Sequence, residues 1–313
     1  MIFLKILPIF LIILLGFFAR KKGFIGTSTI KEISVSITKF FYPALIFSSF
    51  LKNFNADELI DGWQLPLGTF ILMFSGYTTG ILVSKFLRFK NDKEKDTFRF
   101  QCTINNYSFL PMTVIIVLLG EKRIPELILS TFGSEISVWT FGILALTGNR
   151  IKKDSFKNLL SVPMITILLS VLLIFLRDKT GISVENEYLK NFFSSILISI
   201  DLLGKITVPL AIFIAGCRMG DIKLKGIVNL KNAVLVFLRL FLIPAFAILL
   251  FNISGFDKNV RVILNIVAIM PTAIASIVLS EAYNADSEYA AKTTFLTHLF
   301  SFFSIPLWLL FIQ

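Results

Sequence analysis

Two triplets of polar, helix-breaking and acidic residues share one spacing in this chain. In each, a Pro follows an Asn by six residues, and a Glu follows the Pro by ten. The triplets are Asn105, Pro111 and Glu121, and Asn265, Pro271 and Glu281. An Asn amide can donate to a carboxylate or coordinate a cation through its oxygen. A Pro frees backbone groups of the preceding helical turn, which can then bind a charged ligand. The pattern therefore predicts a ligand site built from two copies of one motif.

Each residue of these triplets also has an ordinary structural explanation. A lone Pro in a membrane helix commonly makes a simple kink, and an Asn there commonly bonds a neighbouring helix. The repetition favours a binding site over a kink, while ligand contact and helix-to-helix bonding stay equal alternatives for the Asn side chains. The final Glu of each triplet is better explained as a solvated helix end. The predicted substrate-binding residues are Asn105, Asn106, Ser108, Pro111, Asn265 and Pro271.

A second matched pair consists of Glu135 and His298, the only His in the chain. Each lies too far inside an apolar segment to reach water easily, and an ionisable residue at such depth is a default functional candidate. The Glu could hold a proton or a cation, and an ordinary His pKa of about 6.5 suits proton coupling. Hydrogen-bonded packing is the alternative for His298.

Two further segments share a Lys followed four residues later by a Pro. These predicted scaffold-side residues are Lys39, Pro43, Lys205 and Pro209. A lysine that faces the site would attract an anion, whereas Lys205 could instead pair with Asp201 one turn earlier. The sequence leaves both alternatives open.

The elements that carry these residues are apolar. The chain is 55% hydrophobic, has a mean hydropathy of +0.80, and contains only 16% charged residues. These values exclude an ordinary soluble domain and predict an all-α polytopic membrane protein. The net charge of +11 resides mainly in short loops and is not a sign of nucleic-acid binding. Two Cys residues make neither a disulfide framework nor a metal motif, and no phosphate-binding loop or catalytic triad is found, so we expect no enzyme, no metal and no cofactor.

Ten apolar segments are each near the roughly 20 residues that cross a bilayer. They cover about residues 2–19, 32–51, 64–87, 99–119, 127–148, 160–176, 193–217, 231–252, 261–281 and 289–311. The first lacks a cleavage site and is expected to be retained. Loops after the odd-numbered segments hold about twice as many Lys and Arg as the other loops and the N-terminal end, which predicts both termini outside the cytoplasm.

Five segments per half is an odd number, so two similar halves must insert in opposite senses. Matched stretches support such an inverted repeat, with residues 1–153 as one five-helix unit and 154–313 as the other. They pair residues 39–47 with 205–213 and residues 131–135 with 294–298.

The chain resembles bacterial permeases of the auxin efflux carrier family, which are related to plant PIN carriers and similar in fold to bile-acid sodium symporters. The resemblance rests on the two Asn–Pro segments, on Tyr42–Phe47, and on the run from Pro271 to Tyr283 followed by Asp286. It implies that segments 4 and 9 are broken and cross at mid-membrane, that segments 1, 2, 6 and 7 form a scaffold, and that segments 3–5 and 8–10 form a moving unit. It also implies a homodimer through the scaffold. Many members are Gly-rich near the first Asn, whereas this chain has bulky residues at 106–109, which indicates a narrower or different pocket.

These observations predict a secondary transporter of small organic anions, with carboxylates foremost, in a bacterial cytoplasmic membrane. The expected mechanism is alternating access of the elevator type, with coupling to H⁺ or Na⁺ left open. One alternative is a sodium- or proton-coupled cation antiporter of similar fold, although no paired Asp is evident at the crossing. Another is a membrane sensor that binds a ligand without transport, although no soluble output domain is evident.

Overall fold

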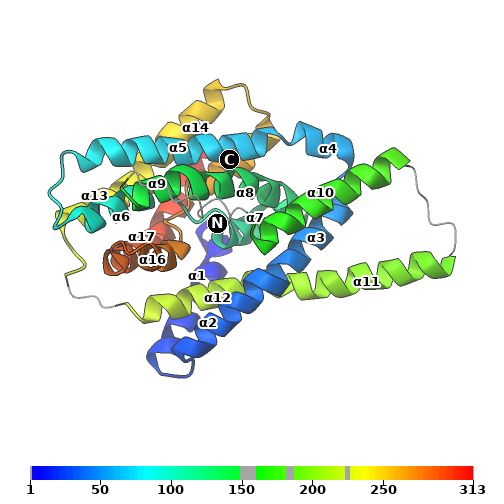
Figure 1. Cartoon of the computed structure of the whole chain (residues 1–313), viewed down its shortest axis with the longest axis horizontal. Helices are drawn as coiled ribbons and strands as arrows, with labels where there is room; N and C mark the ends of the chain where they lie inside the picture. The colour runs from blue at the N-terminus through cyan, green and yellow to red at the C-terminus, as the bar shows by residue number, and fades with distance from the viewer. Residues whose placement is uncertain (1, 149–159, 181–186, 223–225, 313) are drawn as a thin grey trace.

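The computed structural model describes residues 2–148, 160–180, 187–222 and 226–312, and these are almost entirely helical (Figure 1). The predicted boundary between residues 153 and 154 lies outside the described residues. Within the described part, the β-type pairing is a single isolated bridge between Asn105 and Thr272. The α-helices are α1 (Ile2–Lys21), α2 (Thr27–Ser36), α3 (Tyr42–Asn53), α4 (Ala56–Asp61), α5 (Gln64–Ser84), α6 (Asp92–Thr103), α7 (Phe109–Leu119), α8 (Ile124–Ser137), α9 (Ile143–Leu146), α10 (Val162–Thr180), α11 (Glu187–Lys205), α12 (Thr207–Gly220), α13 (Leu230–Phe237), α14 (Ile243–Ile253), α15 (Lys258–Ala268), α16 (Ala275–Ala282) and α17 (Ser287–Ile312).

Among the described residues, 7 helical runs are long and apolar enough to cross a membrane. They correspond to the predicted segments 1, 2, 3, 5, 7, 8 and 10. The runs are Phe3–Lys21, Thr27–Asn53, Ala56–Ser84, Glu121–Leu146, Asn191–Gly220, Leu230–Ile253 and Ser287–Ile312. Predicted segments 4 and 9 are each occupied by two shorter helices, and segment 6 corresponds largely to α10. The prediction of a helical multi-pass membrane protein is therefore confirmed.

Several of the long runs contain a wide helical turn. Such turns join α2 to α3 (η1, Ile37–Phe41), α8 to α9 (η3, Val138–Gly142) and α13 to α14 (η5, Leu238–Leu242). Pro43 and Pro244 each follow one of these turns at the start of a helix. A Pro clashes with the carbonyl four residues earlier, and a wider turn makes room for it. At Pro244 that carbonyl belongs to Leu240, and it accepts a hydrogen bond of 2.7 Å from Trp308 Nε1.

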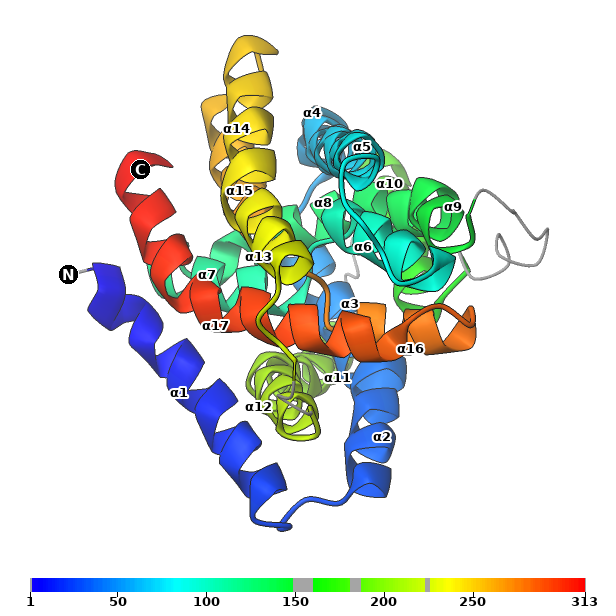
Figure 2. The ribbon, with the colours of Figure 1, turned by 90° about the vertical axis from the view of Figure 1, so that its left-hand side faces the viewer.

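Close helix contacts depend on glycine. In α1, a Cβ added to Gly16 would lie 2.1 Å from the Phe213 carbonyl oxygen of α12. Reciprocally, a Cβ on Gly216 of α12 would lie 2.0 Å from the Ile13 oxygen. Small residues of this kind let membrane helices approach backbone to backbone. Figure 2 shows α1 along one side of the molecule, with α12 seen nearly end-on next to it.

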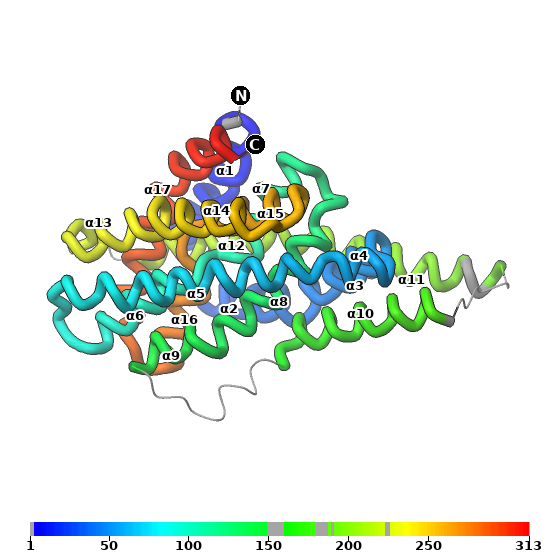
Figure 3. The backbone as a smooth tube through the Cα atoms, turned by 90° about the horizontal axis from the view of Figure 1, so that it is seen from above, coloured from blue at the N-terminus to red at the C-terminus, as the bar shows by residue number. Residues whose placement is uncertain are grey.

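The helices form two packing groups. In one, α1 and α2 pack on α12, and α3 packs on both α10 and α11. In the other, α5 packs on α6, α8 and α14, while α15 lies along α14 and α16 along α17. Figure 3 shows α13, α14 and α15 alongside α5, with α10 and α11 extending away from them. The residues of the two Asn–Pro motifs belong to the second group.

Candidate functional site

The two Asn–Pro motifs meet where helices are interrupted. Helix α6 ends at Thr103 and α7 begins at Phe109, while α15 ends at Ala268 and α16 begins at Ala275. The two non-helical backbone segments between these helices form hydrogen bonds with each other. Asn106 N donates to the Pro271 oxygen at 2.7 Å, and Ala273 N donates to the Ile104 oxygen at 3.3 Å. Backbone groups outside a helix need such partners in an apolar environment. The two motifs, 160 residues apart in the chain, are thus in direct contact.

The asparagines at this junction have unequal roles. Asn105 is fully buried, and its Nδ2 donates to the Val267 oxygen at 2.5 Å. This is the helix-to-helix bond that the sequence left as an alternative. Among the described residues, its Oδ1 and the Oδ1 of Asn265 are buried without a hydrogen-bond partner. Buried acceptors of this kind are costly unless something binds them. The junction therefore holds unused hydrogen-bonding capacity.

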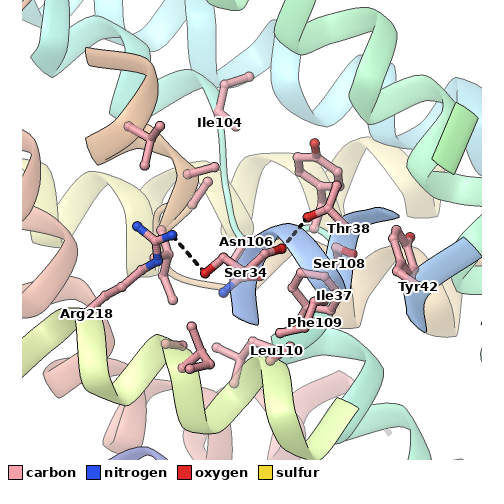
Figure 4. A pocket seen from close by; sticks show the side chains of 18 of the residues that line it. Ser34, Ile37, Thr38, Tyr42, Ile104, Asn106, Ser108, Phe109, Leu110 and Arg218 are labelled. Carbon is pink, nitrogen blue, oxygen red and sulfur yellow. Dashed lines mark hydrogen bonds between the residues drawn. The ribbon is translucent and has the colours of Figure 1, made fainter. Parts of the chain in front are cut away.

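A cavity of about 440 Å³ opens beside the junction (Figure 4). Its wall includes the interrupted segment from Ile104 to Leu110 and the start of α16. Opposite them lie residues of α2, η1 and α12, and further side chains come from α8, η3 and α17. Of the predicted substrate-binding residues, Asn105, Asn106 and Ser108 line this cavity. Pro111, Asn265 and Pro271 are buried behind it and do not line it.

Glu135 and His298 both line the cavity, although they lie in different helices. Both carboxylate oxygens of Glu135 are occupied: Oε1 accepts from the Tyr107 hydroxyl at 2.8 Å, and Oε2 accepts from Trp139 Nε1 at 3.1 Å. An ionised carboxylate only accepts hydrogen bonds, and these two donors suit it. Glu135 is thus held in place at the cavity wall.

His298 is buried, and each of its two ring nitrogens lies close to one polar atom. Its Nδ1 lies 2.9 Å from the Thr294 oxygen, and its Nε2 lies 3.4 Å from Asn106 Nδ2. A neutral imidazole with its proton on Nδ1 satisfies both contacts, since Nε2 then accepts from the amide. A second proton on Nε2 would face the Asn106 amide donor and require that amide to rotate. Protonation of His298 would therefore change the orientation of Asn106, which is a predicted substrate-binding residue.

Arg218 lines the cavity and was missed by the sequence analysis. Its guanidinium donates to the Ser34 hydroxyl at 2.9 Å, and Figure 4 shows the two side chains pointing toward one another. Because Arg218 directly follows the predicted segment 7, it counts among the loop charges that predict the orientation. It lies four residues after Ile214 and three after Ala215, which also line the cavity, so the three share one face of α12. The sequence carries no signal for this placement, because only the fold shows that this face of α12 meets the cavity.

The family match covers almost the whole chain. Residues 1–158 and 147–309 match the family described as Membrane transport protein. The chain belongs to this membrane transport family. It is also 27% identical over 312 residues to an uncharacterized transporter of Methanocaldococcus jannaschii, covering 97% of this chain and 96% of that protein. Family membership indicates a membrane transporter. This family match agrees with the expected resemblance to auxin efflux carriers, in that both place the chain in a family of membrane transporters.

Within this transport-family fold, the predicted scaffold-side residues lie away from the cavity. None of Lys39, Pro43, Lys205 and Pro209 is among the described residues that line it. Lys205 pairs with Asp201 at 3.2 Å, and Asp201 also pairs with Lys52 at 2.9 Å. The structure thus contains the ion pair that the sequence offered as the alternative for Lys205. Pro209 follows the break at Ile206 between α11 and α12.

A buried polar cluster supports the junction from behind. Gln101 of α6 donates through Nε2 to Ser276 at 2.9 Å, to the Ala290 oxygen at 2.9 Å and to Thr294 at 3.1 Å, and it accepts from Thr293. These bonds tie α6 to α16 and α17. Because Thr294 is also the backbone partner of His298, the cluster fixes the helix turn that holds the imidazole. Hydroxyl residues in apolar helices are common, so the sequence did not distinguish this set.

Proposed function

We propose that this protein is a secondary transporter of small organic anions, with carboxylates as the foremost class. The observation that carries the proposal is Arg218 on the wall of a largely apolar cavity that also presents the Asn106 amide. A guanidinium binds a carboxylate with two parallel hydrogen bonds, and amide N–H groups add further donors. An apolar wall with a few convergent polar groups is typical of a small-molecule site. A small anion with an apolar body fits these features.

The helix interruptions support the same ligand class. We propose that they are the crossing of two broken membrane helices, segments 4 and 9, within ten spans arranged as two inverted five-helix repeats. The N-terminal ends of α7 and α16 carry residues that line the cavity. Helix N-termini carry about half a positive elementary charge, so both would favour an anion.

The position of the cavity supports alternating access of the elevator type. Ser34, Tyr42 and Arg218 come from the group that contains α2, α3 and α12, whereas Asn106 and His298 come from the other packing group. A ligand between two groups can be carried when one slides against the other. We propose that segments 1, 2, 6 and 7 form the scaffold and that segments 3–5 and 8–10 move. A homodimer through the scaffold and a bacterial cytoplasmic membrane with both termini outside complete the proposal.

Glu135 and His298 are the proposed coupling residues, for H⁺ or Na⁺. Glu135 at the cavity wall also favours a second function, a proton- or sodium-coupled cation antiporter. A third candidate function is a sensor that binds a ligand without transporting it. Flux separates all three, since an anion carrier moves labelled carboxylate, an antiporter produces a sodium-driven pH change, and a sensor binds without flux.

The deciding experiment begins with a thermal-shift screen of small carboxylates on purified protein, at two pH values and with or without sodium. The stabilising compound is then radiolabelled and its uptake measured in proteoliposomes. We expect uptake by the native chain and strongly reduced uptake by Asn105→Ala and Asn106→Ala. Unchanged uptake in both variants would show that the site is elsewhere. If no carboxylate binds and a sodium gradient shifts lumenal pH, the antiporter is correct.

A further inference from the structure

One arginine lies completely inside the protein at the helix junction. Arg239, in the wide turn η5, has an exposed fraction of 0%. Its Nη1 donates to the Cys102 oxygen at 3.2 Å, and its Nη2 donates to the Ala268 oxygen at 3.0 Å. Cys102 lies in the last turn of α6, and Ala268 ends α15. One guanidinium therefore bridges the C-terminal ends of both interrupted helices.

The C-terminal end of a helix leaves carbonyl groups without partners and carries about half a negative elementary charge. Several of these carbonyls are already satisfied here. The Phe100 oxygen accepts from Ile104 N at 2.9 Å, and the Val267 oxygen accepts from both Met270 N and Asn105 Nδ2. Arg239 satisfies two further carbonyl oxygens of these helix ends, those of Cys102 and Ala268. In an apolar interior, the negative C-terminal ends of α6 and α15 would otherwise attract a cation, as such helix ends do in sodium-coupled transporters.

The charge of Arg239 has no carboxylate partner in the part of the chain that the structure describes. Across the described residues, no ion pair of Arg239 is found, and its Nε has no hydrogen-bond partner. A buried charge needs compensation, and here the two helix ends provide it. Helix α5 contacts the Cys102 carbonyl from the side opposite Arg239. A Cβ added to Gly76 of α5 would lie only 2.3 Å from the Cys102 oxygen. That contact leaves no room for a second ligand of this oxygen on the α5 side.

We propose that Arg239 is a built-in cation that occupies the place of a coupling sodium ion between the two helix ends. The junction then keeps its charge balance in every step of a transport cycle, and its assembly requires no sodium. The proposal concerns the fold of the junction and does not depend on which substrate is carried. Its test measures stability, so its failure would leave the organic-anion proposal standing.

The test uses thermal unfolding of the purified full chain in sodium chloride, choline chloride, or choline chloride with low-millimolar guanidinium. We expect the Tm of Glu135→Gln to be the same in sodium and choline, because this variant lacks the carboxylate proposed to couple to sodium elsewhere in the cavity. Arg239→Ala should lower Tm by about 5–10 °C, because two buried carbonyls lose their donor. Guanidinium should then restore at least half of that loss, because the free ion can enter the space that the side chain vacates.

Leu240→Ala is the matched control. Leu240 lies in the same turn, is also 0% exposed, and carries no charge, so its substitution makes a void that guanidinium should not repair. Equal rescue of the two variants, or no rescue of Arg239→Ala, would overturn the proposal. A sodium-specific rise in Tm that persists in Glu135→Gln, and so does not arise at the proposed coupling residue, would overturn it as well.

If Arg239→Ala yields no folded protein, two substitutions of similar length decide the question. Arg239→Lys keeps the charge and one donor group, whereas Arg239→Met keeps the bulk and removes the charge. A built-in cation predicts a higher Tm for the Lys variant in choline chloride. A side chain that serves only for packing predicts a higher Tm for the Met variant, because a buried unpaired ammonium is costly.

Discussion

At the scale of single residues, the cavity is defined by a few polar side chains held in fixed positions. Glu135 is held by Tyr107 and Trp139, His298 by the Thr294 carbonyl, and Arg218 by Ser34. A fixed donor loses little side-chain entropy when a ligand binds, so it contributes more of its interaction energy to affinity. We expect substitution of Arg218 to change ligand binding and substitution of Glu135 to change coupling.

Arg218→Ala should weaken binding of the carboxylate found in the screen by roughly tenfold or more. A hydrogen bond to a charged group contributes about 1.5–3 kcal/mol, and about 1.4 kcal/mol corresponds to a factor of ten. Arg218→Lys should recover only part of the affinity, because an ammonium lacks the forked geometry. Isothermal titration measures the effect. Lys205→Ala is the control and should leave affinity unchanged, since Lys205 pairs with Asp201 outside the cavity. The reverse ranking of the two variants would reassign the anion contact to Lys205.

Glu135→Gln should separate proton coupling from substrate exchange. The amide keeps an acceptor oxygen and the side-chain shape but cannot gain or lose a proton at neutral pH. We expect substrate-for-substrate exchange to persist while the response of uptake to an imposed pH gradient disappears. Glu281→Gln, at an exposed helix end, should behave like the native chain. A normal gradient response in Glu135→Gln would restrict Glu135 to positioning Tyr107 and Trp139.

At the scale of elements, glycines determine how closely the helices approach. Gly16 and Gly216 meet the partner backbone from both sides of the α1–α12 contact. A methyl group at either position has to displace a carbonyl oxygen, which forces the helices apart and removes packing elsewhere along the contact.

Gly16→Ala and Gly216→Ala should each lower Tm, by an amount corresponding to about 1–3 kcal/mol of overpacking. The double variant should lose less than the sum, because the first methyl group already separates the helices and makes room for the second. Thermal unfolding of the purified variants checks this expectation. Gly26→Ala is the control, since its added Cβ would find its nearest neighbour at 3.7 Å and has space. Additive losses would show that the two contacts are independent.

At the scale of the whole molecule, two arrangements remain predictions, namely the orientation in the membrane and the motion of the transport unit. The loop charges place the loop after segment 3 inside the cell and the loop after segment 8 outside. Both native cysteines, Cys102 and Cys217, are 0% exposed and should contribute little background to thiol labelling.

Orientation is tested with two single substitutions, Lys90→Cys and Ser254→Cys, both at exposed positions. A membrane-impermeant maleimide applied to intact cells should label the second variant and spare the first until the membrane is permeabilised. The opposite pattern would invert the predicted topology and place both termini in the cytoplasm.

Motion is tested by joining the two packing groups. The Tyr42 ring in α3 lies 5.3 Å, centroid to centroid, from the Phe109 ring in α7. A short bismaleimide, which alkylates one thiol at each end, should abolish uptake when it bridges Tyr42→Cys and Phe109→Cys, because it ties the scaffold to the transport unit. The control pair Phe70→Cys and Phe141→Cys, 5.2 Å apart within the transport unit, should retain uptake after bridging. Uptake that survives the first bridge would exclude an elevator movement at this interface.

Much of the architecture follows from local sequence properties. An apolar run of about 20 residues is long enough to cross a bilayer, so the helical spans are readable from the chain alone. A Pro does not by itself locate an interruption, since Pro8 and Pro306 lie inside the continuous helices α1 and α17. Glu135 and His298 were found from the sequence because ionisable residues deep in apolar segments are rare.

The tertiary structure decided which of these residues share a site. Arg218 and Arg239 look like ordinary basic residues of a membrane protein until folding puts one on the cavity wall and the other against two helix ends. Lys39 and Lys205 look equally suited to an anion, yet they lie outside the cavity. The physical reason is that periodicity specifies the face of a helix on which a side chain lies, while its neighbours depend on contacts between helices far apart in the chain.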